Sequence, residues 1–250
     1  MSDLTGKTAV IMGASGEANF GSATARRFAA AGANVVVAAR RLEALESLAE
    51  EIGGLAVACD ITDESQLENL FAKATETYGN VDIALNSSGT HAHTPIAELT
   101  REEILPTLEV SFIGALLFFK HAAAAMQNGG SVITVSSLTS RLPGPGYSVY
   151  SGARAGIDYA IKNATLEYAD KGIRFNSIAA GLIETDMTAG LFSMPGLVDG
   201  FTAAIPCRRM GTIEDFAEAA LWLADPKTSG FINGHVIDLS GGQQMGALPG

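Results

Sequence analysis

The chain has 250 residues, of which 47% are hydrophobic and 17% are charged, and its formal net charge is -11. A chain of this length buries enough surface to fold without disulfide or metal support. The negative balance argues against nucleic acid and anionic membrane surfaces as partners, since neither polyanion is attracted to it.

The apolar stretches and the two cysteines bear on location and on cross-linking. The first residues lack an apolar signal region, and the apolar stretches are too short or too interrupted to span a bilayer, so we expect a cytoplasmic location. Cys59 and Cys207 match neither a disulfide framework nor a zinc spacing and are expected to be small core or interface residues. The low share of charged residues suggests that neighbouring subunits cover part of the surface.

Short β-branched runs alternate with longer helical patterns along the chain. Strands of this length joined by helices need crossover connections, and these build a parallel sheet covered on both faces. The sequence therefore predicts an α/β fold, a doubly wound parallel sheet of seven strands with helices on both faces. In chain order we expect strand 8–12, helix 22–31, strand 34–38, helix 42–52, strand 55–58, helix 64–78, strand 81–86, helices 102–110 and 112–126, strand 131–135, helix 149–168, strand 174–178, helix 213–224 and strand 235–239.

No long linker, repeat or low-complexity segment divides these elements, so residues 1–250 are expected to form one domain. The two long irregular stretches, 138–147 and 181–200, are rich in Gly, Pro and Met. In an open α/β sheet, loops that follow strand ends bind ligands and act as lids. We therefore expect a substrate or lid loop around 181–205.

Three glycines, Gly13, Gly16 and Gly21, lie between the first strand and the first helix. Glycine allows a tight turn and lets backbone amides approach a pyrophosphate at a helix N-terminus. Glycine also simply ends strands, so a plain turn is the alternative. The position between strand and helix favours a dinucleotide site.

Two further positions bear on the nucleotide. Asp60 follows the third strand, where its carboxylate can accept from an adenine amino group or cap the next helix. The second strand ends at Arg40 and Arg41, with no acid. A carboxylate there binds the ribose 2′-hydroxyl of NAD(H), whereas arginine binds the 2′-phosphate of NADP(H). NADP(H) is therefore favoured over NAD(H), with two solvated arginines as the alternative.

A second group of residues carries acid–base chemistry. Ser137 follows the fifth strand, Tyr150 comes later, and Arg154 lies four residues beyond Tyr150. On a helix such a pair shares one face, so the guanidinium lies beside the phenol, where a cation favours the phenolate. A serine hydroxyl can hold a carbonyl oxygen at the same point. The set supplies a proton donor, a cation that tunes it and a positioning donor.

In this order the motifs resemble the short-chain dehydrogenase/reductase family over essentially the whole chain. The resemblance implies a Rossmann-type fold, hydride transfer with a nicotinamide, and a homotetramer or homodimer in which helices 112–126 and 149–168 pair across a two-fold axis. The motifs that carry it are the glycine turn 13–21, Asp60, Asn86-Ser87-Ser88-Gly89, Ser137 with Tyr150, residues 174–181, Thr185 and Ser240-Gly241-Gly242.

Two positions depart from the family pattern. Arg154 stands where the family has a lysine that binds ribose and relays a proton, and Ser111 stands where it has an asparagine that holds a water. Arginine keeps its charge but does not release a proton, so it tunes Tyr150 without relaying through itself. A Ser/Tyr/Arg set also resembles the halohydrin dehalogenases, which use no nucleotide, but the retained glycines and Arg40 favour redox chemistry.

We therefore expect an NADP(H)-dependent oxidoreductase that reduces a carbonyl, or oxidises a secondary alcohol, on a small apolar substrate. The alternatives are a halohydrin dehalogenase-like lyase and a weakly active dinucleotide binder. No metal site is expected, and His91 and His93 are expected to edge the cleft or to be solvated. The expected catalytic residues are Ser137, Tyr150, Arg154 and Ser111. The expected cofactor residues are Gly13, Ser15, Gly16, Phe20, Gly21, Arg40, Arg41, Asp60, Ile61, Asn86, Gly89, Tyr150, Arg154, Gly181, Ile183 and Thr185. The side chains expected to form an apolar substrate pocket are Leu138, Leu142, Met187, Leu191, Phe192, Met194 and Phe201.

Overall fold

The computed structural model describes residues 2–90 and 92–245. Within them lies a parallel sheet of seven strands in the order β3-β2-β1-β4-β5-β6-β7, so the predicted α/β fold is confirmed. The strands are β1 (Thr8–Met12), β2 (Asn34–Ala39), β3 (Leu55–Ala58), β4 (Ile83–Asn86), β5 (Gly130–Ser137), β6 (Ile173–Ala180) and β7 (Val236–Leu239).

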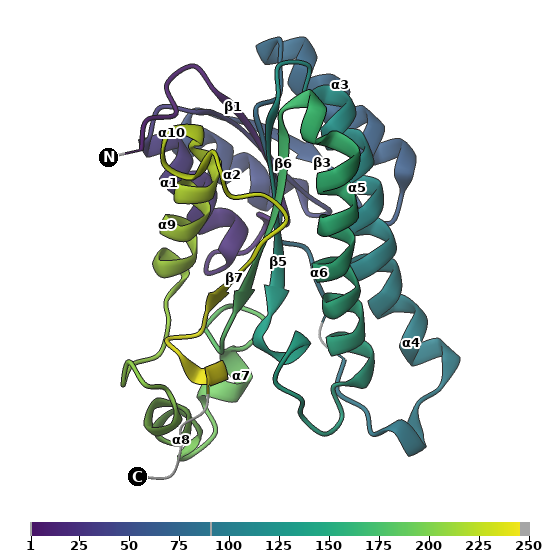
Figure 1. Ribbon diagram of the computed structural model, residues 1–250, viewed down its shortest axis with the longest axis vertical. Helices are drawn as coiled ribbons and strands as arrows, with labels where there is room; N and C mark the ends of the chain where they lie inside the picture. Colours follow the sequence, from purple (N-terminus) through teal and green to yellow (C-terminus); the bar gives the residue numbers. More distant parts are fainter. Residues whose placement is uncertain (1, 91, 246–250) are drawn as a thin grey trace.

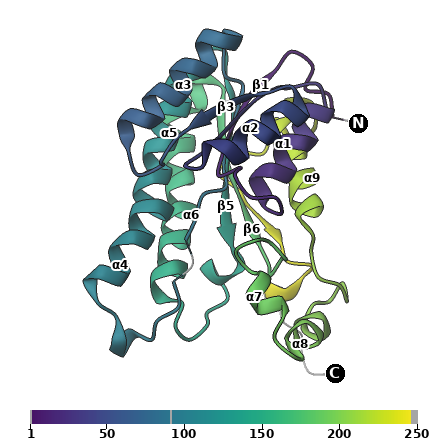
Figure 2. The same ribbon diagram turned by 180° about the vertical axis from the view of Figure 1, so that it is seen from behind.

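Helices cover both faces of the sheet, as Figures 1 and 2 show from opposite sides. One layer contains α3 (Glu64–Tyr78), α4 (Arg101–Leu108), α5 (Gly114–Ala125) and α6 (Ser148–Tyr168). The other layer contains α1 (Phe20–Ala30), α2 (Leu42–Ile52), α9 (Ile213–Ala224) and α10 (Pro226–Ser229).

The strands are mainly apolar because both of their faces are covered. In β1, Val10 and Met12 belong to the core cluster under α3, α5 and α6, while Ala9 and Ile11 belong to the cluster under α1, α2 and α9. Successive side chains of a strand point to opposite faces, so one short run serves two cores. The carboxyl ends of the strands lie outside these two cores and open onto the cavity.

The two helices predicted at 102–110 and 112–126 are one continuous helical segment. A π-helical stretch, η2 (Glu109–Ile113), joins α4 to α5 where the prediction placed a break. A π-bulge inserts one extra residue into the helix, which explains why the periodicity changes there without the helix ending.

The predicted irregular stretches also contain short helices. They are η3 (Leu138–Ser140), α7 (Ala189–Phe192) and α8 (Leu197–Ala204). Turns of this length form through tertiary packing rather than through intrinsic propensity, so the sequence pattern does not reveal them.

The expectation that apolar stretches are too short to cross a membrane is wrong for one segment. The continuous helix Arg101–Ala125 is long and apolar enough by length and composition. This is weak evidence for a membrane span, because the core helix of a soluble protein passes the same test. In this structure Phe118, Phe119 and Ala122 of α5 are buried in the core cluster.

The two cysteines differ in reactivity because they differ in burial. Cys59 is fully buried in the core, where burial raises the pKa of its thiol to about 12, with the carboxylates of Asp60 and Asp63 adding to the effect. Cys207 is exposed. Only a thiolate reacts rapidly with disulfide reagents. We predict that the native protein releases one equivalent of chromophore from Ellman's reagent at pH 8 and two after denaturation. Two equivalents from the native protein would contradict the burial of Cys59.

Candidate active site

One large cavity opens at the carboxyl ends of the strands. In Figure 1 the arrowheads of β5 and β7 point to the end of the molecule where α7 and α8 lie. The cavity has a volume of about 1030 Å³ and is lined by residues that follow β1, β2, β3, β4, β5 and β6. Because all strands are parallel, segments far apart in sequence meet at this edge.

The glycine turn forms one wall. Gly13 has a φ of +92°, and a Cβ there would lie 2.7 Å from Ser87 Oγ, so a side chain is excluded on both counts. Ser87 Oγ donates to the Met12 carbonyl at 2.8 Å, which holds the end of β4 against the turn. Asn19 caps α1 by accepting from the Ser22 amide at 2.7 Å. The N-terminus of α1, where partial positive charge gathers, therefore begins at the cavity.

The far end of the cavity carries the two arginines. Arg40 and Arg41 line it, and Arg41 Nη2 donates to the Ser15 carbonyl at 2.7 Å. Asp60 lies at the same end, where its Oδ1 accepts from the amide and hydroxyl of Thr62. The cap of α3 is Asp63, so the alternative reading of Asp60 as the helix cap is wrong. Ile61 lies beside Asp60 in the same wall.

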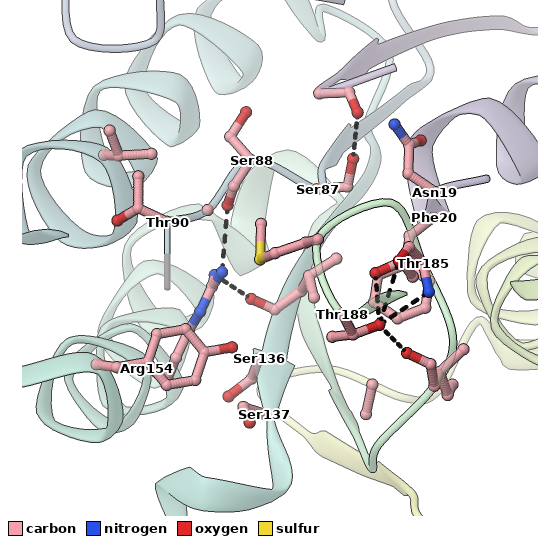
Figure 3. Close-up of a pocket in the computed structure, with 18 of the residues that line it drawn as sticks. Asn19, Phe20, Ser87, Ser88, Thr90, Ser136, Ser137, Arg154, Thr185 and Thr188 are labelled. Atoms are coloured by element: carbon pink, nitrogen blue, oxygen red, sulfur yellow. Dashed lines mark hydrogen bonds between the residues drawn. The ribbon is translucent and has the colours of Figure 1, made fainter. Parts of the chain in front are cut away.

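Arg154 lies beneath Tyr150 on α6. Its Cζ is 5.4 Å from the centroid of the tyrosine ring, and the side chain is only 4% exposed. Its Nη1 donates to the Val135 carbonyl at 2.7 Å and its Nη2 to the Ser88 carbonyl at 3.3 Å (Figure 3). Two backbone carbonyls therefore hold a permanent cation next to the phenol, as the spacing of four residues predicts.

Gly89 leaves the space that this guanidinium occupies. A Cβ on Gly89 would lie 2.1 Å from Arg154 Nη2. The glycine was expected to let the cofactor approach, and in the structure it also makes room for Arg154. The sequence pattern alone does not show that the position of Arg154 depends on Gly89.

Ser137, the last residue of β5, lines the cavity. Its oxygen accepts from the Thr139 amide at 3.2 Å and from the Thr139 hydroxyl at 3.0 Å, and it caps η3. A serine hydroxyl has one donor and two acceptor sites. With both acceptor sites used, the group is left to act as a donor. That is the role expected of a residue that holds a carbonyl oxygen.

Three of the expected residues lie behind the cavity wall rather than in it. Gly21 packs α1 onto the turn, since a Cβ there would lie 2.6 Å from the Gly13 carbonyl. Asn86 is buried, and its Oδ1 accepts from the Ser88 amide at 2.9 Å, so its side chain caps the turn after β4. Ser111 is fully buried in η2, and within the described part of the chain its Oγ has no hydrogen-bond partner.

The opposite wall follows β6 and contains Gly181, Ile183 and Thr185. Thr188, which the sequence reasoning missed, organises it: its Oγ1 donates to the Ile183 carbonyl at 2.7 Å and accepts from the Thr185 amide at 2.9 Å. Thr185 and Thr188 face Arg154 and Ser137 across the cavity (Figure 3). The spacing of three residues between two threonines was the available signal.

The part of the cavity near Tyr150 is apolar. Leu138, Leu142, Met187, Leu191 and Phe201 line it as expected, together with Pro143, Tyr147 and Leu197, which were not singled out. Phe192 and Met194 were also expected here but do not line the cavity. His93 is exposed and packs its ring edge-on against Tyr147 at 4.8 Å, whereas His91 lies outside the described residues.

These residues fit a dinucleotide. The glycine turn brings backbone close to the N-terminus of α1, and two arginines lie at the far end. The side chains of Asn19 and Asp186 pack against Gly16 where a Cβ would lie. The cavity is also larger than a typical pocket for one small ligand, as a site for cofactor and substrate together must be.

Comparisons with known proteins agree with this geometry. A family profile described as "Enoyl-(Acyl carrier protein) reductase" matches residues 13–244. The chain is 32% identical to carbonyl reductase family member 4 of Xenopus tropicalis, over 92% of this chain and 95% of that protein. It is 34% identical to 3beta-hydroxysteroid dehydrogenase 1 of Eggerthella lenta, over 97% and 95%. A solved structure assigned as a gluconate dehydrogenase of Agrobacterium tumefaciens superposes with a TM-score of 0.93 at 28% identity, covering 98% of both chains.

The contact between Gly89 and Arg154 yields a prediction. Gly89→Ala should displace the guanidinium from Tyr150 and lower turnover by about tenfold, while the melting temperature changes little because a flexible side-chain end gives way. In a protein that already carries Arg154→Lys, Gly89→Ala should lower turnover by a smaller factor, because the branched guanidinium is gone. Steady-state kinetics of the four proteins measure the coupling. Equal losses in both backgrounds would show that Gly89 serves something other than Arg154.

Proposed function

The chain belongs to the short-chain dehydrogenase/reductase family, and on this basis we propose that it is an NADP(H)-dependent reductase of an apolar carbonyl compound. It is an NAD(P)-dependent oxidoreductase of small carbonyl and alcohol substrates by family. The substrate class, the preference for NADP(H) and the residue roles are the proposal. The observation that carries it is one cavity that Tyr150, Ser137 and the glycine turn all line.

Tyr150 serves as the proton donor in this proposal. A nicotinamide held by this site would supply the hydride that the carbonyl carbon needs. The carbonyl oxygen accepts the phenolic proton of Tyr150, and the alcohol forms as the phenol becomes a phenolate. The Ser137 hydroxyl donates to the same oxygen and orients it. Solvent then returns a proton to Tyr150, which balances the cycle.

Arg154 replaces the lysine of the family in a changed role. Its charge beside the ring favours the phenolate that forms in reduction. Two of its five N–H groups are bound to backbone carbonyls, so others remain for a ribose hydroxyl. Ser111 has an unpartnered, fully buried oxygen in the described structure, which supports a bound water there. This Ser-Tyr-Arg set tunes the phenol and leaves proton return to water.

The preference for NADP(H) rests on Arg40 and Arg41 at the far end of the cavity. Both lie where the second strand ends, and the residues there include no acid that would repel a 2′-phosphate. The presence of this nucleotide end also favours redox chemistry over a halohydrin dehalogenase reaction, which needs no nucleotide. Asp60 and Ile61 complete the adenine side of the proposed site.

The apolar half of the cavity supports a substrate without a formal charge. Among its lining residues near Tyr150 are Leu138, Leu142 and Phe201, and their burial by a ligand favours binding in proportion to apolar area. We propose that the chain is one domain whose segment 181–205 acts as a lid, since α7 and α8 bring Leu191 and Phe201 over this half.

A homotetramer or homodimer is also part of the proposal. Apolar side chains are exposed on the helix layer that the family resemblance places at a two-fold axis: Leu105, Ile113, Leu116, Tyr159 and Leu166. A patch of this kind on a monomer is usually covered by a partner. A cytoplasmic location remains an expectation from the sequence.

Tyr150→Phe tests the catalytic assignment. NADPH oxidation with a panel of apolar ketones should fall by at least about a hundredfold, because the proton donor is lost while the apolar contacts remain.

Wild type should melt at a higher temperature in millimolar NADPH. No such stabilisation would contradict the redox proposal, and halide release from a halohydrin without nucleotide would replace it. Nucleotide binding without reduction of any ketone would identify a dinucleotide binder.

Arg40→Ala tests the cofactor preference. Loss of a charge-assisted contact to the 2′-phosphate should weaken NADPH binding by about tenfold and leave NADH binding within about threefold. Arg101→Ala is the matched control, because Arg101 is exposed at the start of α4 and outside the cavity lining. Titration calorimetry measures both nucleotides. Equal weakening for NADPH and NADH would mean that Arg40 does not read the phosphate.

A further inference from the structure

A buried carboxylate lies on the same helix as Tyr150 and Arg154. Asp158 is 9% exposed and follows Tyr150 by two helical turns, so the three residues form one stripe of α6. Among the described residues no basic side chain forms an ion pair with it. The group is therefore buried next to the active site without a countercharge in contact.

Three serine hydroxyls bind this carboxylate instead. Ser136 Oγ and Ser140 Oγ donate to Oδ2 at 2.9 Å and 2.8 Å, and Ser177 Oγ donates to Oδ1 at 2.9 Å. Hydrogen bonds to a charged acceptor are stronger than neutral ones, and a buried charge is stable only when it is hydrogen-bonded. Three hydroxyls thus bind one carboxylate, and each comes from a different element: β5, η3 and β6.

Two of these serines bracket the catalytic serine. Ser136 precedes Ser137 directly, and Ser140 ends η3, the turn that Ser137 caps. Both bind the same oxygen of Asp158. The segment 136–140 is thereby tied at both ends to the helix that carries Tyr150. We propose that Asp158 is a positioning residue that sets the place of Ser137 relative to Tyr150, an inference that rests on the catalytic roles proposed above.

The third serine supplies an internal comparison. Ser177 lies in β6, which is already registered with β5 through eight pairs from Gly130 with Ile173 to Ser137 with Ala180. Its bond to Asp158 therefore joins the sheet to α6 but does not hold the η3 turn that Ser137 caps. Ser140 is different, because η3 has left the sheet, and this bond joins the end of η3 to α6. Removal of the Ser140 or the Ser177 hydroxyl deletes one hydrogen bond to Asp158, and the two bonds have similar lengths.

Ser140→Ala and Ser177→Ala are the test pair. Both should lower the melting temperature by similar amounts and leave the dissociation constant of NADPH unchanged. Only Ser140→Ala should lower kcat, by about tenfold, since small misplacement of a reacting partner costs rate. With NADPH deuterated at the transferred position, the isotope effect on kcat should rise in Ser140→Ala alone, because the chemical step becomes slower than product release.

Asp158→Asn is the conservative variant. Its amide oxygen still accepts from Ser136 and Ser140, and its amide nitrogen donates to Ser177, so kcat should stay within about threefold of wild type. If kcat of Asp158→Asn falls as far as that of Ser140→Ala, the negative charge of Asp158 matters rather than its hydrogen bonds to the serines, and the proposal is overturned. So would unchanged kcat in Ser140→Ala, or equal losses of kcat in both serine variants.

Hydrogen exchange separates this proposal from the function it rests on. Amides of residues 137–142 should exchange faster in Ser140→Ala than in wild type or Ser177→Ala, with the rest of the chain unchanged. If wild type reduces no carbonyl compound, the proposed function fails while this local effect still stands. Uniformly faster exchange, or none, would mean that Asp158 contributes only to general stability and would overturn the positioning role.

Discussion

The parallel direction of all seven strands is the constraint on which the site depends. Parallel strands bring every carboxyl end to one edge of the sheet. The residues that meet there are the glycine turn after β1, the arginines after β2, Asp60 after β3 and Ser137 at the end of β5. No local pattern in the sequence links these positions. Helix α6 contributes Tyr150 and Arg154 to the same cavity. The chemistry is thus assembled between one sheet edge and one helix.

Arg154 has contacts that suit a guanidinium. A planar guanidinium needs more room and more acceptors than an ammonium group. The structure meets both needs with Gly89 for the room and with the carbonyls of Val135 and Ser88 for two donors. Charge is kept beside the phenol, while Ser111, the second departure from the family, is left as a buried hydroxyl behind the wall.

The sequence predicted those features that periodicity or spacing encodes. The bounds of β1, α2, β3, α3 and α9 match the prediction, because long apolar patterns and clear turn residues define them. Tyr150 and Arg154 were paired correctly from a spacing of four residues. The features that were missed depend on contacts between distant segments: α7 and α8 form over the cavity, Phe192 and Met194 turn away from it, and Asn86 satisfies its own turn. No local pattern records such contacts.

The hydrogen bonds of Ser137 have a consequence for chemoselectivity. Because Thr139 occupies both of its acceptor sites, the hydroxyl offers only a proton, and Arg154 adds positive charge to the same wall. A ketone oxygen, which accepts, suits this wall. A protonated imine, which is cationic and donates through nitrogen, meets a donor and a like charge there. From the proposed roles of Ser137 and Tyr150 we therefore expect the protein to reduce oxygen electrophiles in preference to nitrogen ones.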